Sequence, residues 1–522
     1  MNAHNLALNQ GSVQTLKTSR IRKALPYMVT LSIFQLIVST AFYMVAAQKL
    51  NKPDLGLVST LTFLYTIFTT LAPLALPIAG TKFVSEFIGK NEREVAANVA
   101  HTVVRLVSIL SFVFLLGFSA LSFLSISAFN WPQDVLIFLI ITFVASSLAV
   151  LRLTYMGLMQ GLQLFDRYAL SNVLALILAR LVGVVLILFD AGLTGFATGM
   201  LSGEVFGLIL SVLYYRGSLP KAVNPYDSKS LLKFSLPLFV MNIITVSSEW
   251  IDRAIFLAVS HDLEALGVYE LVIRGASSLT VIWAIIDVIL LPVFSEAYGH
   301  KGKGELIKPL KSALRYLVFM YFPAALGLAA VSKTVMALLF GSGYVGGSMP
   351  LAILSVFSML KAFTIIMGST LKSIGETKVF VKASVTSLVV NGVIVAVLTP
   401  FFSLYGAVAG RACAVIVVFI YVFYELKRNI KIEVDLQGLW KGTLASLTLV
   451  VPLQVFEVFI YGNIIENPVI SISIEIGLGL IFYATALFLL KALNRDDFTL
   501  LKQLTPKPLL KIVRFFERLL IH

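Results

Sequence analysis

Apolar segments about 20 residues long recur along the whole chain, and this feature restricts the fold more than any other. A helix of about 20 residues spans the roughly 30 Å hydrocarbon core of a bilayer. Hydrophobic residues make up 58% of the 522 residues and charged residues only 13%, which is too little polar side chain to cover a soluble protein. We predict an all-α polytopic membrane protein with fourteen spans, at residues 25–47, 57–80, 103–127, 134–158, 168–190, 193–215, 233–257, 266–293, 312–331, 349–371, 380–400, 404–424, 441–461 and 468–491.

Lysine and arginine are concentrated in every second connection between these spans. The basic connections hold Lys17, Arg20, Arg22, Lys23, Lys82, Lys90, Arg93, Arg216, Lys221, Lys229, Lys301, Lys303, Lys308, Lys311, Lys372, Lys378, Lys427, Arg428 and Lys431. The alternate connections hold only Lys49, Lys52 and Lys333, beside acids such as Asp134, Asp190, Asp262, Glu264 and Glu466. Since Lys and Arg mark short cytoplasmic loops, we expect a multi-pass cell-membrane protein with both termini in the cytoplasm. The net charge of +14 then reflects topology, and no nucleic acid partner is expected.

The chain also repeats itself at an offset of about 210 residues. Leu55-Gly56 begins a span that ends in Ser85-Glu86-Phe-Ile-Gly89, and Leu266-Gly267 begins one that ends in Ser295-Glu296-Ala-Tyr-Gly299. Two further matching segments, each with glycines four apart at the start of a sixth span, are 195–199 and 406–410. Small residues at this spacing let helices approach closely. We therefore predict a duplicated unit of six helices, with both copies in the same orientation because six is an even number.

The repeat predicts two six-helix lobes, at residues 1–215 and 233–426, joined by a polar cytoplasmic linker at 216–232. Residues 427–497 add two transmembrane helices outside the repeat. The tail, 498–522, has apolar residues at helical spacing and basic residues between them. This pattern is typical of an amphipathic helix, either at the membrane interface or packed on the protein. Two lobes around a midplane cavity are a transporter architecture in which rocking alternates access.

Several short motifs, taken in order, point to a known family. They are Leu55-Gly56 with Ser85-Glu86-x-x-Gly89, Asp252-Arg253, Leu266-Gly267-Val268-Tyr269, Phe340-Gly-Ser-Gly-Tyr344 and Gly375-Glu-Thr-Lys378. With them, over essentially its full length, the chain resembles the polysaccharide-export (Wzx-type) flippases of the multidrug/oligosaccharidyl-lipid/polysaccharide exporter superfamily. The resemblance implies translocation of a lipid-(pyro)phosphate-linked oligosaccharide from the cytoplasmic to the outer leaflet, for cell-surface polysaccharide or glycan assembly. It also implies membrane lipids and glycan-assembly enzymes as partners.

Ionisable side chains inside the spans are the best sequence evidence for a binding site, because each costs about 2.5–3.5 kcal/mol to insert. Arginine and lysine can replace the lost hydration of a diphosphate. In the order in which we expect them to contact a substrate phosphate, the candidate cations are Lys361, Arg411, Arg274, Arg253 and Arg180. The acids within the spans are Glu204, Glu249, Asp252, Glu270 and Asp287, and the first four are candidate coupling or pairing carboxylates.

The same charges also have a structural interpretation. Glu249 and Arg253 are four residues apart, as are Glu270 and Arg274, and the acid comes first, which is the favourable order for an intrahelical pair. Arg180 would similarly pair with Glu204 on the neighbouring span. Two cations, Lys361 and Arg411, have no acid on their own helix, although an acid on the seventh or eighth span could still pair with either. Both interpretations stay open for every one of these charges.

Two other classes of function are compatible with many spans. A cation-coupled multidrug exporter of the same superfamily would be expected to carry a carboxylate in its first span, where this chain offers only Gln35 and Gln48. A membrane glycosyltransferase or polymerase would need acids such as Asp-x-Asp near a large loop, and the chain has no such motif. Without a Walker motif or metal-ligand spacing, we expect no enzyme activity, catalytic residue, metal or bound cofactor. Coupling to a proton or a sodium ion stays open.

Overall fold

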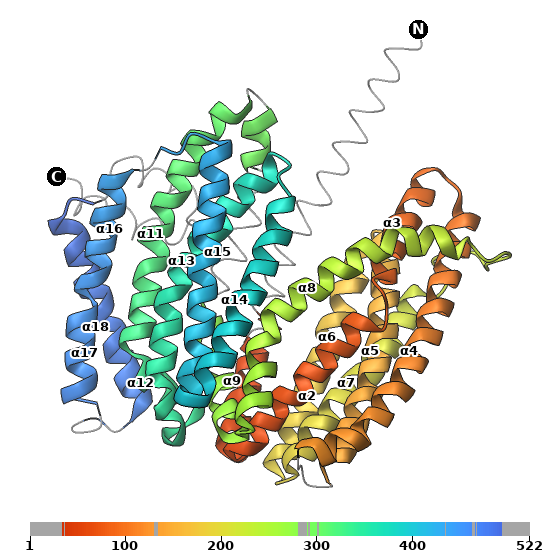
Figure 1. The fold of residues 1–522 in the computed structure, drawn as a ribbon, viewed down its shortest axis with the longest axis horizontal. Coiled ribbons are helices and arrows are strands. Elements are labelled where there is room, and N and C mark those ends of the chain that lie inside the picture. Colours follow the sequence, from red (N-terminus) through yellow and green to blue (C-terminus); the bar gives the residue numbers. More distant parts are fainter. Residues whose placement is uncertain are drawn as a thin grey trace. The chain divides into compact units, whose positions relative to one another are not determined.

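The chain forms two compact units, Met1–Gly267 and Val268–His522. The computed structural model describes residues 34–35, 37–129, 134–279, 290, 293–299, 302–433, 435–461, 465 and 467–492. Helices make up both units over these residues (Figure 1), so the predicted all-α class is confirmed. The predicted linker, 216–232, lies inside the first unit.

The first unit is a bundle built around α5. The helices that it contains among the described residues are α2 (Lys52–Leu71), α3 (Leu76–Gly89), α4 (Arg93–Phe129), α5 (Val135–Gly161), α6 (Phe165–Leu188), α7 (Gly192–Tyr215), α8 (Ser228–Ser260) and the first residues of α9 (Leu263–Ser277). A further helical stretch, 37–49, precedes them. Helix α5 packs against α2, α3, α4 and α7, while α6 pairs closely with α7. Any side chain buried on α5 is therefore surrounded by several helices.

The second unit combines a helical bundle with three later helices, α16, α17 and α18. Its elements are the rest of α9, η1 (Gly302–Leu306), α11 (Ile307–Ala330), α12 (Ser332–Phe340), η2 (Ser342–Gly347), α13 (Ser348–Ser373), α14 (Lys378–Phe402), α15 (Leu404–Asn429), α16 (Leu436–Thr448), α17 (Val450–Phe459) and α18 (Pro468–Leu489). Helix α13 packs against α11 and α15, and α14 pairs with α15. Helices α16 and α17 pack on α11, and α18 packs on α12. The segment after residue 427 is thus attached to one side of this unit.

Most of the predicted spans are present as helices. In the part of the chain that the structure describes, 12 helical segments are long and apolar enough to cross a membrane, and they coincide with the predicted spans two to seven and nine to fourteen. The first span, 25–47, and the eighth, 266–293, lie partly outside the described residues, so the total of fourteen stays a prediction. The tail at 498–522 lies wholly outside them. The chain is a multi-pass membrane protein.

The second predicted span is not one continuous helix. Helix α2 ends at Leu71, and α3 begins only at Leu76. Pro73 lies in the gap, and because proline lacks an N–H and its ring clashes with the preceding turn, a helix breaks there. Leu74 and Ala75 then adopt positive φ angles of 47° and 55°. The predicted second span, 57–80, therefore consists of two helices, a break that its hydrophobicity alone does not reveal.

The two Leu-Gly motifs of the repeat pack directly against each other. A Cβ atom on Gly56 would overlap the carbonyl oxygen of Leu263, and one on Gly267 would overlap the carbonyl oxygen of Lys52. The contact is reciprocal, because 267 minus 56 and 263 minus 52 both give 211. In each copy of the motif, the glycine therefore packs against backbone that lies four residues before the glycine of the other copy. An ion pair between Lys52 and Glu264, 2.9 Å long, lies beside this crossing.

The second pair of repeated glycines has the packing role that we expected. Gly199 meets α6 at Ala179, where a Cβ atom would lie 2.6 Å from the carbonyl oxygen, and Gly406 meets α14, where a Cβ atom would lie 2.6 Å from the nitrogen of Thr399. The hairpins α6–α7 and α14–α15 are consequently the closest-packed helix pairs of their units. Small residues at the predicted positions allow this approach.

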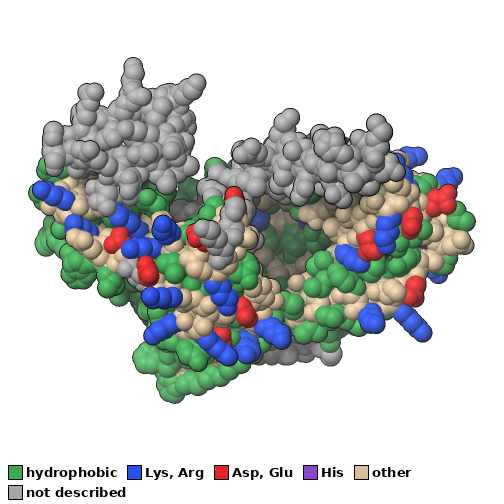
Figure 2. All heavy atoms as spheres, turned by 90° about the horizontal axis from the view of Figure 1, so that it is seen from above, with side chains coloured by type: hydrophobic (Ala, Val, Ile, Leu, Met, Phe, Trp, Pro, Cys, Tyr) green, Lys and Arg blue, Asp and Glu red, His purple; other side chains and the backbone are tan. Residues whose placement is uncertain are grey.

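Basic and acidic loops of the first unit lie at opposite ends of its bundle. At one end, Arg93 donates to the carbonyl of Ser218, which joins the start of α4 to the α7–α8 loop. Figure 2, which looks onto the top of Figure 1, shows Lys and Arg side chains at this end of the first unit. At the other end, Lys49 lies 3.9 Å from Asp190. This separation agrees with the alternation of charge along the sequence.

We predict that Gly267→Ala and Gly56→Ala each destabilise the protein. The added methyl group would have to displace backbone, which costs about 1–3 kcal/mol in a packed interior. The readout is the thermal unfolding midpoint of purified protein in detergent. Gly117→Ala in α4 is the control, because nothing lies within 4 Å of its Cβ position, so it should leave the midpoint unchanged or raise it. Equal midpoints for all three variants would contradict the proposed tight crossing.

Candidate functional site

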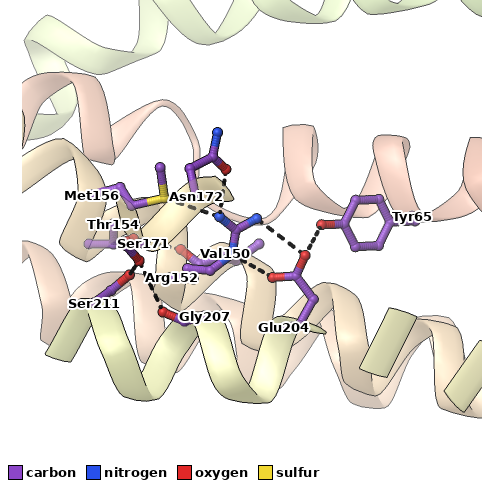
Figure 3. Close-up of polar contacts among 10 residues, drawn as sticks. All are labelled: Tyr65, Val150, Arg152, Thr154, Met156, Ser171, Asn172, Glu204, Gly207 and Ser211. Atoms are coloured by element: carbon purple, nitrogen blue, oxygen red, sulfur yellow. Dashed lines mark hydrogen bonds and ion pairs between the residues drawn. The ribbon is translucent and has the colours of Figure 1, made fainter. Parts of the chain in front are cut away.

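A buried ion pair joins α5 to α7 in the first unit (Figure 3). Arg152 Nε donates to Glu204 Oε2 at 2.7 Å, and Arg152 Nη2 donates to Glu204 Oε1 at 3.2 Å. Such two-point contact fixes the orientation of both groups. The two side chains are only 9% and 11% exposed. Because removing two charges from water is costly, the pair stabilises the fold only while both partners are present.

Three neighbouring side chains complete this network. Tyr65 Oη on α2 donates to Glu204 Oε1 at 2.8 Å. Arg152 Nη1 donates to Asn172 Oδ1 on α6 at 3.2 Å and contacts the sulfur of Met156 at 3.1 Å. Figure 3 shows the tyrosine and the arginine approaching the carboxylate from different helices. Four helices, α2, α5, α6 and α7, are therefore tied together through one carboxylate and one guanidinium.

Small residues on α7 make room for the guanidinium. Gly207 follows Glu204 by one turn, and a Cβ atom there would lie 2.6 Å from Cδ of Arg152. A turn later, the hydroxyl oxygens of Ser171 and Ser211 are 2.7 Å apart and join α6 to α7. The run of glycine and serine on α7 therefore allows a long basic side chain to lie between packed helices.

The network is electrically neutral and depends on the charge of Glu204. Loss of that charge would leave the guanidinium of Arg152 buried without a counter-charge, and Tyr65 would lose a charged acceptor. Since Tyr65 is the contact from α2, the broken helix, the state of one carboxyl can govern how firmly α2 is held to α5 and α7. Glu204 is thus a carboxylate whose charge has a structural consequence.

The prediction that Arg180 pairs with Glu204 was wrong. Glu204 bonds to Arg152 and Tyr65 instead. Helix α6 packs on α7 through Ala175, Ala179 and Gly183, and Arg180, one residue further round the helix, points elsewhere. Its guanidinium lies over the ring of Phe42, 4.5 Å from the centroid, which is a favourable cation–π geometry.

Three buried charges escaped the sequence analysis. Arg152 lies inside the fourth predicted span, and Glu457 and Glu475 lie inside the thirteenth and fourteenth. All three are more than 90% buried. The signal that singled out the other deep charges, an ionisable residue within an apolar span, would have identified each of them.

Arg253 in α8 is held by three neighbours on its own helix. Its Nη1 lies 3.8 Å from Asp252 Oδ1 and donates to the backbone carbonyl of Glu249 at 3.1 Å. Its guanidinium also stacks on Trp250, 4.3 Å from the ring centroid. Asp252 is fully buried, whereas Glu249 is exposed. Arg253 therefore contacts Glu249 through its backbone, and Asp252 contributes a charge that the spacing rule did not single out.

The second predicted intrahelical pair is confirmed. Arg274 Nη2 and Nε each lie 2.7 Å from Glu270 Oε1 on α9. Glu270 is buried and Arg274 is one-third exposed.

The remaining predicted cations lie on two adjacent helices of the second unit. Lys361 on α13 is exposed and Arg411 on α15 is half-buried, and these two helices pack together. Arg180 and Arg253 belong to the first unit. The remaining acid, Asp287, lies outside the described residues.

The Ser85-Glu86-x-x-Gly89 motif ends α3 in a charged and aromatic cluster. Glu86 accepts from Lys82 Nζ at 2.6 Å and from Lys90 Nζ at 2.7 Å. These hydrogen bonds lower the pKa of Glu86 to about 2. Lys82 also lies over the ring of Phe83, 3.8 Å from its centroid. At neutral pH the motif therefore carries an ionised acid between two lysines on the basic end of the bundle.

We predict that Arg152→Met and Glu204→Gln each destabilise the first unit. Removing one partner of a buried pair leaves the other uncompensated and typically costs about 3–5 kcal/mol. The double variant should recover much of this loss because no unpaired charge is left. Thermal unfolding in detergent measures all three variants.

Arg167→Met is the matched control for this series. Arg167 donates to the backbone carbonyl of Tyr214 at an exposed position, and losing such a bond costs only about 1 kcal/mol. An Arg152→Met variant that is no less stable than this control would show that the buried pair does not hold the helices together.

Known proteins share both sequence and fold with this chain. The probable low-salt glycan biosynthesis flippase Agl15 of Haloferax volcanii is 23% identical over 310 residues, which cover 59% of this chain and 64% of that protein, just under two thirds of its length. The lipid II flippase MurJ of Bacillus subtilis is 25% identical over 411 residues, which cover 70% and 75% of the two chains.

Two solved structures show the same fold at low identity. The inward closed conformation of lipid II flippase MurJ superposes with a TM-score of 0.70 at 15% identity, covering 88% of this chain and 98% of that one. An inward-facing multidrug resistance MATE family transporter of the MOP superfamily gives 0.61 at 18% identity, covering 76% and 95%. The family described as polysaccharide biosynthesis protein matches residues 45–349. That match covers more than half of the chain, which therefore belongs to this family.

Proposed function

We propose that the chain is a flippase, which translocates a lipid-(pyro)phosphate-linked oligosaccharide from the cytoplasmic to the outer leaflet for surface polysaccharide or glycan assembly. The observation that carries this proposal is the sequence match to two proteins that are both named as flippases, one of glycan biosynthesis and one of lipid II. The family match to a polysaccharide biosynthesis protein supports the same substrate class. The lipid-linked oligosaccharide and membrane lipids would be its binding partners, and enzymes of glycan assembly would supply and consume the substrate.

The mechanism that we propose is alternating access by two helical units. The sugar and phosphate would cross a hydrated path while the lipid tail stays in the bilayer. Lys361, Arg411, Arg274, Arg253 and Arg180 would contact the phosphate, in this order of preference. Lys361 and Arg411 lead because their own predicted spans, 349–371 and 404–424, carry no acid.

The membrane potential favours outward movement of such a head group. Two negative charges crossing an inside-negative potential of 100 mV gain roughly 4–5 kcal/mol. A proton or a sodium ion moving inward could add to this driving force.

A cation-coupled multidrug exporter is the alternative. The MATE structures share the fold, which by itself says nothing about substrate. The two sequence relatives, in contrast, are both named as flippases, and this favours the lipid-linked substrate. A membrane glycosyltransferase or polymerase is less well supported, since neither relative is named as one.

We place the protein in the cell membrane with both termini in the cytoplasm, and single cysteines test this orientation. Cys413 is the one native cysteine, so Cys413→Ala gives a clean background. Asn91→Cys lies in the exposed basic α3–α4 connection, and Asp190→Cys lies at the opposite, exposed end. A membrane-impermeant maleimide should label position 190 in intact cells and position 91 only after permeabilisation. The reverse pattern would invert the proposed topology.

We predict that proteoliposomes containing the protein transfer a fluorescent polyprenyl-pyrophosphate oligosaccharide between leaflets. The double variant Lys361→Ala/Arg411→Ala should transfer it at least about tenfold more slowly. Each charge-assisted hydrogen bond contributes about 1.5–3 kcal/mol, and 1.4 kcal/mol corresponds to a factor of ten.

A second double variant controls for the loss of two positive charges. Lys308→Ala/Lys378→Ala removes two exposed lysines at helix ends of the same unit and should transfer at the wild-type rate. Equal transfer by all three proteins would leave Lys361 and Arg411 with structural roles only. No transfer by the wild type, together with gradient-driven uptake of lipophilic cations, would identify a drug exporter instead.

A further inference from the structure

Side chains of α17 and α18 form hydrogen bonds with the interrupted α11–α12 segment. Helix α11 ends at Ala330, and α12 begins at Ser332. Gln454 Nε2 on α17 donates to the carbonyl of Ala330 at 2.9 Å. Glu457 Oε1, one turn later on α17, accepts from the backbone N–H of Thr334 at 3.0 Å. One helix thus satisfies a carbonyl at the end of α11 and an amide at the start of α12, groups that a helix leaves without partners at its ends.

A second carboxyl group reaches the same threonine. Glu475 Oε1 on α18 accepts from Thr334 Oγ1 at 2.9 Å. Thr334, Glu457 and Glu475 are 0%, 6% and 1% exposed. Two carboxyl groups from different helices therefore meet at one buried residue, and each lies in the electrostatic field of the other.

The charges around this pair do not balance. The positive charge of Lys333 on α12 attracts the carboxylate of Glu457. The Nζ atom of Lys333 also lies over the ring of Tyr461, 5.6 Å from the ring centroid. The amide of Thr334 at the start of α12 also favours a negative charge on Glu457. Tyr461, which follows α17, is near both glutamates and contributes no positive charge at neutral pH. Among the described residues no basic side chain forms an ion pair with Glu475, so one positive charge faces two acids.

Glu475 also has an oxygen atom without a partner. Among the described residues, its Oε2 atom is buried and makes no hydrogen bond. Ser471 precedes it by one turn on α18, and its hydroxyl oxygen is likewise buried without a hydrogen bond. Residues four apart share one face of a helix. Two oxygen atoms with unused acceptor capacity therefore lie on the face of α18 that carries Glu475.

We propose that Glu475 is a binding site for a monovalent cation, with Ser471 and Glu457 beside it. An ionised carboxylate buried without a counter-charge costs several kcal/mol. A proton on Oε2, or a sodium ion held by Oε2 and the neighbouring oxygen atoms, removes this cost. With the cation bound, Glu457 on α17 and Glu475 on α18 can both keep their hydrogen bonds with Thr334. Without it, two negative charges repel each other across the α12 contact. This proposal rests on the proposed transport function and extends it, since it names Glu475 as the residue that would bind a coupling ion.

Thermal stability tests the occupancy of this site without any transport assay. The unfolding midpoint of the purified wild type is measured at fixed pH while sodium replaces choline, and then at fixed sodium concentration while the pH is varied. A ligand that binds only the folded state raises the midpoint with its concentration. A sodium site therefore predicts a rise with sodium. A proton site predicts a midpoint that falls as the pH rises, together with an infrared carbonyl band of a protonated carboxyl group.

Glu475→Gln should abolish the cation dependence, because a neutral amide needs no counter-charge, and it should remove the infrared band. Glu305→Gln, an exposed acid in the same unit, should retain the wild-type dependence. Glu475→Asp keeps the carboxyl group, so it should retain a cation response and reports on the site if the glutamine variant fails to fold. The proposal is overturned if the unfolding midpoint of the wild type changes with neither sodium concentration nor pH. It is also overturned if the midpoint of Glu475→Gln responds to the cation as the wild type does. Either result would leave the flippase assignment untouched, because that assignment is tested by lipid transfer.

Discussion

An ionised side chain or a free backbone group inside an apolar bundle must find a partner, since neither lipid nor hydrocarbon side chains can hydrogen-bond to it. The first unit meets this constraint at the Arg152–Glu204 pair, where four helices contribute to a single neutral network. Helix α8 contributes local partners, because Arg253 contacts the carboxylate of Asp252 and the carbonyl of Glu249. The positions of several helices therefore follow from a small number of polar contacts.

Interrupted helices extend the same constraint to the backbone. Pro73 breaks the segment between α2 and α3, and Tyr65 lies two turns before that break, where it is fastened to Glu204. In the second unit, Gln454 and Glu457 occupy the backbone groups exposed between α11 and α12. In both units a helix that cannot hydrogen-bond continuously is held by side chains from a neighbour. The residues after 427, which lie outside the internal repeat, supply those side chains in the second unit.

The sequence predicts the features that depend on local pattern. It does not predict contacts that depend on how one helix is rotated relative to another. Span positions, the basic and acidic ends and the glycine contacts follow from hydrophobicity, charge and spacing, and so does the Glu270–Arg274 pair. Pattern alone does not identify the partner of Glu204, because Arg152 and Arg180 are both deep cations on neighbouring helices. Small residues form the face of α6 that packs on α7, so Arg180 lies outside that contact, whereas Gly207 leaves space for the side chain of Arg152. The break at Pro73 was predictable in principle, since two prolines lie within five residues of each other.

The reciprocal contact between Gly56 and Gly267 has a consequence for the history of the chain. Gly56 meets the backbone of Leu263, and Gly267 meets the backbone of the equivalent residue, Lys52. The same reciprocal pattern is found in the isologous interface of a two-fold symmetric dimer. If the repeat arose by duplication of a shorter chain, two copies of that chain could have paired through the same contact. Because the contact is made by glycine and backbone, it leaves the surrounding side chains free to differ between the two copies. Either glycine alone still limits the whole crossing, so the two positions must be retained together.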